Sequence, residues 1–166
     1  MVAGRAYTNT LSKDLLRVEV ADVMYAIDVS RVAEIINPLP LVDLPRDREP
    51  VLGVTEYRDQ VLAVVDLRRF FGVAAAEPTK RTKWVIVRMP QRLAAFVVDA
   101  VVDVFSSQQQ PYRPVPALDS KHEMRGIKSA FKHRGELVFH LDVERLTRPA
   151  AAAFETGFPA FAAERK

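Results

Sequence analysis

Three aspartates that each end an apolar run are the side chains best suited to chemistry in this sequence. Asp66, Asp99 and Asp142 each follow a stretch of aliphatic or aromatic residues. A carboxylate held at such a point could act as a general base. An aspartate at a strand end also caps a following helix or turn by accepting backbone N–H groups. That structural role accounts for all three positions, and we favour it.

The three histidines do not add a site. His122 falls in a predicted loop, His133 in a predicted turn and His140 on a predicted strand, with no spacing typical of metal ligands. The sequence contains no cysteine, no glycine-rich phosphate loop and no nucleophile elbow. We therefore predict that the protein is not an enzyme and has no catalytic residue, metal site or cofactor.

Asp66 and Asp142 occupy the same place in two copies of one pattern. Each copy opens on a glycine, Gly53 or Gly126, and continues through a polar turn and an aliphatic run to the aspartate. A chain that repeats one β unit is expected to build two similar subdomains. Two subdomains leave a groove between them, so the repeat indicates binding before it indicates catalysis.

Composition is typical of a folded chain that does not enter a membrane. The sequence has 166 residues, of which 49% are hydrophobic, enough for one domain or two joined lobes. Its apolar runs are too short for a membrane-spanning helix, and residues 1–13 lack the apolar core of a signal peptide. We expect no membrane insertion and a cytoplasmic location, with which the absence of cysteine is compatible.

Charge gives little support to nucleic-acid binding. The sequence holds 24 basic and 21 acidic residues, for a net charge of +3. Its one dense basic cluster is Lys80, Arg81 and Lys83. Such residues are most often solvated loop positions, and the alternative is an electrostatic patch for an acidic partner.

The local patterns predict mainly β-structure. Alternation at 16–20 places Leu16, Val18 and Val20 on a buried face and Arg17 and Glu19 on a wet face. Further strands are expected at 24–27, 53–57, 60–65, 83–87, 93–98 and 101–105, and in a final hairpin before Asp142. Many short strands with regular turns favour paired small β-barrels.

Two short helices are expected beside the strands. Asp28 is a candidate N-cap for an amphipathic helix that ends near Ile36. Residues 67–71 are expected to make one helical turn ended by Gly72, a residue suited to the left-handed position after a helix.

The chain ends in a segment that we interpret as a tail. We expect an N-terminal extension at 1–14, a folded domain of two intertwined lobes at 15–147 and a flexible tail at 148–166. Phe154, Phe158 and Phe161 recur at helical intervals, but Gly157 and Pro159 disfavour a stable helix. We favour a frayed tail; the alternative is an aromatic peptide that docks on this protein or on a partner.

One segment carries a resemblance to a known family. Residues 53–68, which run from Gly-Val-Thr-Glu-Tyr to Val-Asp-Leu-Arg, resemble the signature of the CheW-like domain, found in coupling proteins of bacterial chemosensory systems. Residues 25–28, 32–35 and 96–104 supply supporting matches in the same order. The resemblance implies two five-stranded, SH3-like β-barrels, which agrees with the internal repeat.

The family resemblance implies a non-catalytic adaptor. Members link the cytoplasmic tips of chemoreceptors to a CheA-type histidine kinase. They bind the receptor in the groove between barrels, and they bind the regulatory domain of the kinase barrel against barrel. We therefore expect these two partners, no nucleic acid, and recruitment to receptor–kinase clusters in a chemotaxis or motility pathway.

The resemblance also assigns individual residues. The receptor-groove positions are Val32, Arg58, Val85 and Ile86, and the kinase-contact positions are Val29, Glu34 and Gly53. An arginine at a hairpin tip can make a bidentate contact with an acidic receptor helix. The other readings are a solvated turn for Arg58, core packing for the aliphatic positions and a bulge or close backbone approach for Gly53.

Four residues depart from the family pattern. Glu56, Asp59, Ala63 and Ala95 stand where Asn, Gly, Pro and Gly are usual. Aspartate tolerates a left-handed turn, but the Asp59 carboxylate could pair with Arg58. The alternatives therefore stay open: a module that binds only receptor or only kinase in a non-motility pathway, or a small β-barrel nucleic-acid binder.

Overall fold

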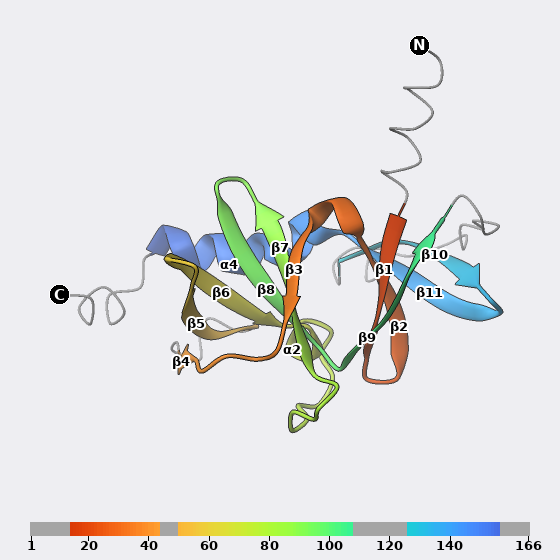
Figure 1. Ribbon diagram of the computed structural model, residues 1–166, viewed down its shortest axis with the longest axis horizontal. Coiled ribbons are helices and arrows are strands. Elements are labelled where there is room, and N and C mark those ends of the chain that lie inside the picture. The colour runs from red at the N-terminus through yellow and green to blue at the C-terminus, as the bar shows by residue number, and fades with distance from the viewer. Residues whose placement is uncertain (1–13, 44–49, 108–125, 157–166) are drawn as a thin grey trace, which may run out of the picture.

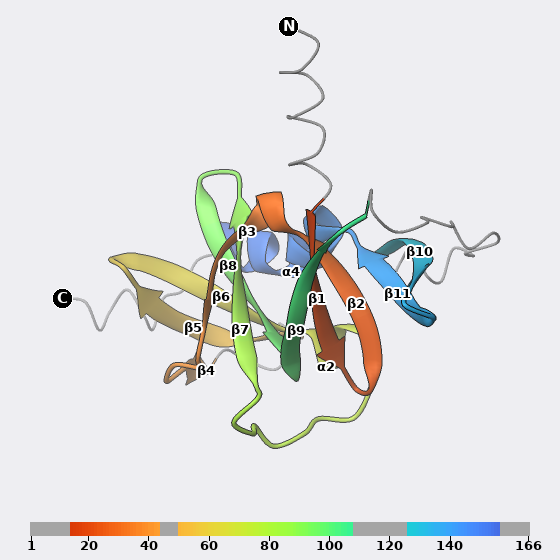
Figure 2. The same cartoon turned by 45° about the vertical axis from the view of Figure 1, so that its right-hand side comes forward.

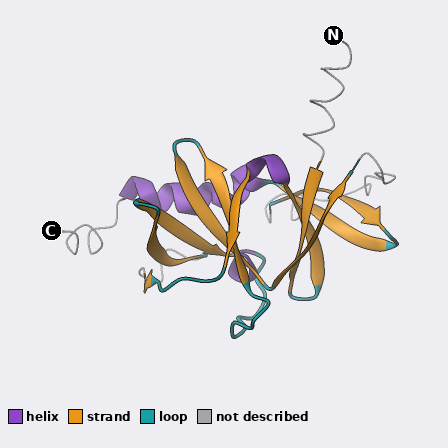
Figure 3. Ribbon diagram, viewed as in Figure 1, coloured by secondary structure: helices purple, strands orange, loops and turns teal. Residues whose placement is uncertain are grey.

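The computed structural model describes residues 14–43, 50–107 and 126–156. They form two β-sheet lobes side by side, with one long helix packed behind them (Figure 1). Strands dominate and helices are few (Figure 3), so the prediction of a mainly β, two-lobed architecture is confirmed. No helix among the described residues is long and apolar enough to cross a membrane.

The first lobe is built from both ends of the described chain. Its five strands lie in the order β10-β11-β2-β1-β9, and only the β11–β2 pair is parallel. The strands are β1 (Asp14–Val20), β2 (Val23–Asp28), β9 (Ala100–Ser106), β10 (Ile127–His133) and β11 (Glu136–Leu141). The chain therefore leaves this lobe after β2 and returns to it at β9.

The second lobe occupies the middle of the chain. Its strands lie in the order β3-β7-β8-β6-β5-β4, with the β6–β8 pair parallel. They are β3 (Val32–Ile36), β4 (Val42–Asp43), β5 (Val51–Tyr57), β6 (Gln60–Asp66), β7 (Lys83–Met89) and β8 (Arg92–Val98). The two-residue strand β4 is the sixth member of a lobe for which five strands were expected.

Two-residue turns join three of the hairpins. Both turn residues have positive φ at Ala21–Asp22, Arg58–Asp59 and Arg134–Gly135. That backbone suits the right-handed twist of the flanking strands. Asp59, with φ of 64°, shows that the hairpin accommodates aspartate in place of glycine.

The internal repeat is real, but its copies align differently from the prediction. The Asp66 N–H donates to the Pro50 carbonyl at 3.1 Å, and the Asp142 N–H donates to the Gly126 carbonyl at 2.7 Å. Gly126 therefore corresponds to Pro50 and not to Gly53. Val51 pairs with Val65 and Ile127 pairs with Leu141, and the same register shift follows in both strands, so Gly53 corresponds to Ser129.

The predicted helix from Asp28 to Ile36 is wrong beyond its first turn. A single 3-10 turn, η1 (Val29–Arg31), lacks a side-chain cap from Asp28 and leads directly into β3. The β-branched residues of β3 pair antiparallel with β7. This sheet pairing outweighs the helical spacing, because β-branched side chains suit a strand better than a helix.

The prediction that Arg17 lies on a solvent-exposed face of β1 is also wrong. This residue is only 8% exposed. Its guanidinium donates to both oxygens of Asp103 at 3.0 Å and to Glu136 at 2.7 Å. Paired carboxylates allow the charge to be buried, so both faces of β1 contribute to the interior.

The first part of the predicted flexible tail is a helix. Helix α4 (Val143–Thr156) continues through Pro149. Its apolar face is buried: Val143, Leu146 and Ala150 belong to the shared core, and Ala153 is also buried. Burial of this face outweighs the hydrogen bond that Pro149 removes. Residues 1–13 and 157–166, including Phe158 and Phe161, lie outside the described residues.

One large core joins the lobes. It includes Leu16 and Ile27 from the first lobe, Val85 and Phe96 from the second, and Leu146 from α4. Smaller clusters fill the interior of each lobe, around Leu62, Trp84 and Ile86 in the second and around Leu15 and Phe131 in the first. Because the lobes share a core, surface residues of both are held in a fixed relation.

Candidate partner-binding surface

Arg58 lies at the tip of the β5–β6 hairpin. Its side chain is 71% exposed, with φ of 49°. The guanidinium lies 5.3 Å from the centre of the Tyr57 ring. A cation in this position can reach a partner without rearrangement of the fold.

Glu34 lies beside Arg58 although the two are 24 positions apart in the sequence. A carboxylate oxygen of Glu34 on β3 is 3.0 Å from the Arg58 guanidinium. The Asp59 carboxylate is not the partner in this ion pair. The residues assigned by resemblance to different partners therefore touch each other, which the sequence did not indicate.

Val29 and Val32 flank the start of β3. Both are half-buried and pack against the shared core. The Val32 carbonyl accepts a hydrogen bond from Arg88 at 2.7 Å, and the Ser30 carbonyl accepts one from the same nitrogen at 3.2 Å. Arg88 thus fixes the segment that carries Val29 and Val32 against β7.

Val85 and Ile86 are completely buried on β7. Val85 belongs to the core shared by the lobes, and Ile86 belongs to the interior of the second lobe. This is the packing role that the sequence left open for them. Any effect of these residues on a partner would act through the position of β3, which pairs with β7.

Gly53 marks a close approach of two backbones. A Cβ atom built at this residue would overlap the carbonyl oxygen of Val42 and lie 3.2 Å from the Asp43 Cα. Glycine is therefore required for β4 to pair with β5. A side chain at this position would displace β4, which is one of the two edge strands of the second lobe.

Exposed valines on β9 are surface features that sequence reasoning missed. Val104 is 58% exposed and Val102 is 38% exposed. β9 is an edge strand of the first lobe and extends from the junction between lobes (Figure 2). Exposed apolar side chains on an edge strand are typical of contact surfaces. The sequence does contain a signal for this surface, because Val102 and Val104 stand on either side of the charged residue Asp103.

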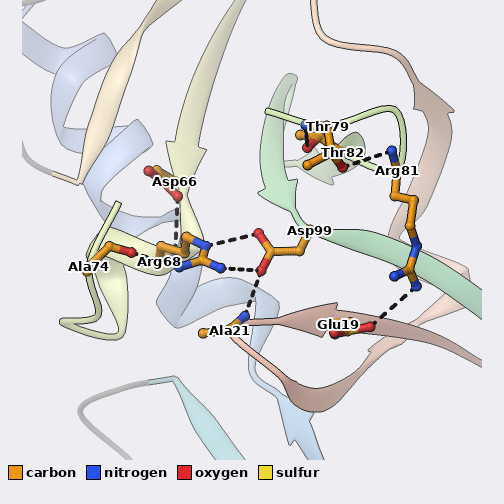
Figure 4. A network of polar contacts seen from close by, with 9 residues as sticks. All are labelled: Glu19, Ala21, Asp66, Arg68, Ala74, Thr79, Arg81, Thr82 and Asp99. Carbon is orange, nitrogen blue, oxygen red and sulfur yellow. Dashed lines mark hydrogen bonds and ion pairs between the residues drawn. The ribbon is translucent and has the colours of Figure 1, made fainter. Parts of the chain in front are cut away.

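A polar network joins the two lobes. The Arg68 guanidinium donates to both oxygens of Asp99, at 3.0 and 2.7 Å, and to the Ala74 carbonyl at 2.8 Å. Asp99 also accepts the Ala21 N–H at 2.7 Å. Figure 4 shows Arg68 of α2 (Leu67–Phe70) reaching Asp99 beside the β1–β2 turn. The network therefore fixes the second-lobe helix to the first lobe.

The three strand-end aspartates have different roles. Asp66 caps α2 through the Arg68 N–H at 3.0 Å, and Asp142 accepts the Arg145 N–H of α4 at 3.3 Å. The expected capping role is confirmed for these two. Asp99 instead binds the Arg68 side chain and Ala21, so a cap or turn alone does not explain it.

The pKa values of the aspartates reflect these contacts. Burial raises the pKa of Asp66, against the opposing Arg68 N–H and the nearby arginines. Burial also acts to raise the pKa of Asp99, but its hydrogen bonds from Arg68 and Ala21 outweigh burial and lower it. Two aspartates in related positions are therefore shifted in opposite directions.

Two histidines make specific contacts. The His140 ring nitrogen Nε2 lies 2.8 Å from an Asp28 oxygen, and the Lys128 Nζ lies 3.4 Å from the other oxygen. His133 is the last residue of β10 and not part of a turn, and it is almost completely buried. His122 lies outside the described residues.

Comparison with known proteins identifies the class. Residues 14–150 match the CheW-like domain family, and the chain belongs to that family. It is 27% identical over 142 residues to a chemotaxis protein CheW of Rhizobium meliloti, covering 86% of this chain and 91% of that protein. It is 30% identical over 131 residues to the CheW of Helicobacter pylori, covering 78% of each.

A solved structure shares the fold. The scaffolding protein TtCheW from Thermoanaerobacter tengcongensis superimposes with a TM-score of 0.67 at 21% identity. The match covers 78% of this chain and 84% of that one. The family resemblance seen in the sequence is therefore confirmed, together with the fold that it implied.

Proposed function

We propose that this protein is a non-catalytic signalling adaptor that couples chemoreceptors to a CheA-type histidine kinase in a chemosensory pathway. The observation that carries the proposal is the CheW-like match over residues 14–150, which spans both lobes. The adaptor acts in the cytoplasm, at receptor–kinase clusters. Its partners are the receptor's cytoplasmic tip and the kinase's regulatory domain.

The receptor surface includes Arg58, Val32 and the exposed valines of β9. Arg58 supplies a cation for acidic side chains on a receptor helix. Val102 and Val104 supply apolar area that the fold leaves uncovered. Val85 and Ile86 support this surface from the core, because β7 pairs with the strand that carries Val32.

The kinase surface includes Val29, Glu34 and the β4–β5 pair around Gly53. Gly53 acts by permitting β4 to lie against β5, as the overlap with the Val42 carbonyl requires. Glu34 is shared, because its carboxylate pairs with Arg58. The two surfaces therefore meet at one ion pair on the second lobe.

The nucleic-acid alternative is not favoured. Arg81 of the basic cluster pairs with Glu19, and the Lys83 Nζ donates to Asn37 and to a backbone carbonyl. Trp84 is only 3% exposed, so it cannot stack on bases. Single-strand binders need exposed aromatic side chains beside a basic groove.

The direct test is a binding assay with two purified baits from the same organism. One bait is a chemoreceptor signalling tip, and the other is the regulatory domain of a CheA-type kinase. Binding to both is expected. Binding to one bait alone would instead establish a module that binds only receptor or only kinase, and binding to neither would overturn the proposal.

Charge reversal at the hairpin tip tests the receptor surface. Arg58→Glu is expected to weaken binding to the receptor tip at least tenfold, roughly 1.4 kcal/mol, because it replaces a cation with a charge that the receptor repels. The fold should survive, since an exposed ion pair contributes only about 0–1 kcal/mol. Isothermal titration calorimetry and thermal unfolding measure the two effects. Unchanged receptor affinity in a folded variant would contradict the assignment.

The Arg58–Glu34 pair supplies a matched control. The double variant Arg58→Glu with Glu34→Arg restores an ion pair between the hairpin and β3. If Arg58 contacts the receptor directly, this exchange leaves receptor binding weak. Recovery of receptor binding would show that Arg58 acts by positioning β3.

A further inference from the structure

The two edge strands of the first lobe meet through side chains. β10 and β9 lie at opposite ends of the sheet order. The Phe105 ring of β9 nevertheless stacks on the His133 ring of β10 with centroids 4.0 Å apart, and lies 5.8 Å from the Phe131 ring. Within the described strands, no backbone pairing joins β9 to β10. These aromatic contacts hold this side of the lobe together with Arg17, which pairs with Asp103 of β9 and Glu136 of β11.

His133 is an unusual residue for such a position. It is 1% exposed, and neither ring nitrogen has a hydrogen-bond partner in the described part of the chain. An unpaired buried polar group costs roughly 1–3 kcal/mol. Its uncharged ring is accommodated as an aromatic partner of Phe105. If the ring took up a second proton and became charged, neither N–H group would have a hydrogen-bond acceptor among the described residues.

Four charged groups act on His133, and they come from three strands and one turn. Arg17 lies on β1, Asp103 on β9, Glu136 on β11 and Arg134 in the turn after β10. Arg17 already engages both carboxylates, Asp103 at 3.0 Å and Glu136 at 2.7 Å. A charged His133 would therefore be a second buried cation beside a guanidinium whose counter-ions are in use.

We propose that His133 is a proton-sensitive latch: the neutral ring closes the β9–β10 side of the first lobe, and its protonation opens that side. The latch is a property of the isolated protein and does not depend on the identity of its partners.

The direction of the pH dependence follows from the environment. Burial lowers the pKa of His133 below its ordinary 6.5, Arg17 and Arg134 lower it further, and Asp103 and Glu136 oppose them. The opened state therefore binds a proton more readily than the closed state. Closure is strongest above 6.5, the ordinary value, and weakens as pH falls from there towards the lowered value.

The latch has a consequence for binding that rests on the proposed function. We call the β9–β10 contact the seam. Phe105 and Asp103 point towards it, whereas Val102 and Val104 of the same strand point outward. Loss of the Phe105–His133 contact frees the outer edge of β9, which stays paired with β1, and disturbs the proposed receptor surface. Receptor-tip binding is therefore expected to weaken on acidification in parallel with opening.

The test uses NMR on the full chain. The ring signals of His133 give its pKa, and amide hydrogen exchange gives the protection of β9 and β10 at each pH. We expect His133 to titrate below 6.5 and protection to fall by up to about tenfold per pH unit in that range. β7 of the second lobe, whose protection should not follow the His133 titration, is the internal reference.

Two variants separate this histidine from the other described one. His133→Phe keeps an aromatic ring against Phe105 and should abolish the pH-dependent loss of protection. His140→Gln, which alters the contact with Asp28, should retain it. Titration of His133 at or above its ordinary value, or an unchanged pH dependence in His133→Phe, would overturn the latch. If His133→Phe does not fold, the wild-type titration and exchange decide the question.

Receptor binding is measured separately with the same proteins. Wild-type affinity should fall on acidification, and His133→Phe should bind equally well throughout. Absence of receptor binding at every pH would overturn the proposed function. The hydrogen-exchange data would still test whether His133 protonation opens the β9–β10 side. Binding that is independent of pH, with a seam that opens, would overturn only the link between them.

Discussion

Replacing Gly126 with alanine is expected to destabilise the protein by about 2–4 kcal/mol, because strain and overpacking add. Gly126 has a φ of +78°, and a Cβ atom there would lie 2.6 Å from the Leu146 Cδ2 and 2.9 Å from its Cγ. Leu146 is completely buried between α4 and the core. The side chain cannot move away without opening a cavity. Chemical denaturation monitored by Trp84 fluorescence measures the loss.

Gly135→Ala is the matched control. Gly135 has a similar φ of +82°, but nothing lies within 4 Å of a Cβ built there. This variant should lose only the stability that backbone strain costs, about 1 kcal/mol. Equal losses at the two glycines would show that contact with Leu146 does not matter. The comparison thus isolates the cost of crowding where the second copy of the repeat meets its helix.

Removing the Arg68 side chain is expected to cost about 2 kcal/mol and to loosen the junction between lobes. Arg68→Ala deletes two charge-assisted hydrogen bonds to Asp99, and such bonds contribute about 1.5–3 kcal/mol each at most. Partial exposure of both groups, 21% and 29%, reduces that figure. Denaturant unfolding measures stability, and amide exchange at Ala21 reports the junction itself.

The same variant should change the acid sensitivity of the protein. Asp99 has a pKa below its ordinary 3.8 because the Arg68 and Ala21 hydrogen bonds outweigh burial. A carboxyl group with a lowered pKa contributes stability above 3.8, the ordinary value, and loses it as pH falls through the lowered value. Arg68→Ala should therefore lose less stability than the wild type on acidification through this range. A parallel decline in both proteins would contradict this role.

Arg81→Ala controls for the loss of an arginine in the same region. Arg81 also appears in Figure 4, where it reaches Glu19 on the first lobe. Its side chain is 69% exposed and its contact distance is 3.4 Å. An exposed pair of this kind contributes about 0–1 kcal/mol. A loss as large as that of Arg68→Ala would mean that total charge, and not the two-bond contact between Arg68 and Asp99, stabilises the junction.

The sequence by itself determined most of the strands, the paired lobes and the family. Alternation of apolar residues and short polar turns is local information, so the hairpins at 53–65 and 83–98 were predicted close to where they occur. The caps at Asp66 and Asp142 were also predictable, because an N-cap contacts residues only two or three positions away. The ordered matches of residues 25–104 were enough to indicate the CheW-like fold.

Only the tertiary structure decided which elements the ambiguous segments form and which side chains meet. Residues 32–36 became a strand because β7 offered it a partner, and residues 148–156 became helix because the core offered burial. The local sequence propensity of these segments holds no information about β7 or about the core. The Arg58–Glu34 pair, the Arg17 network and the stacking of His133 on Phe105 join residues distant in sequence. Their spacing carries no signal, since the contacts exist only after the sheets have curved and closed.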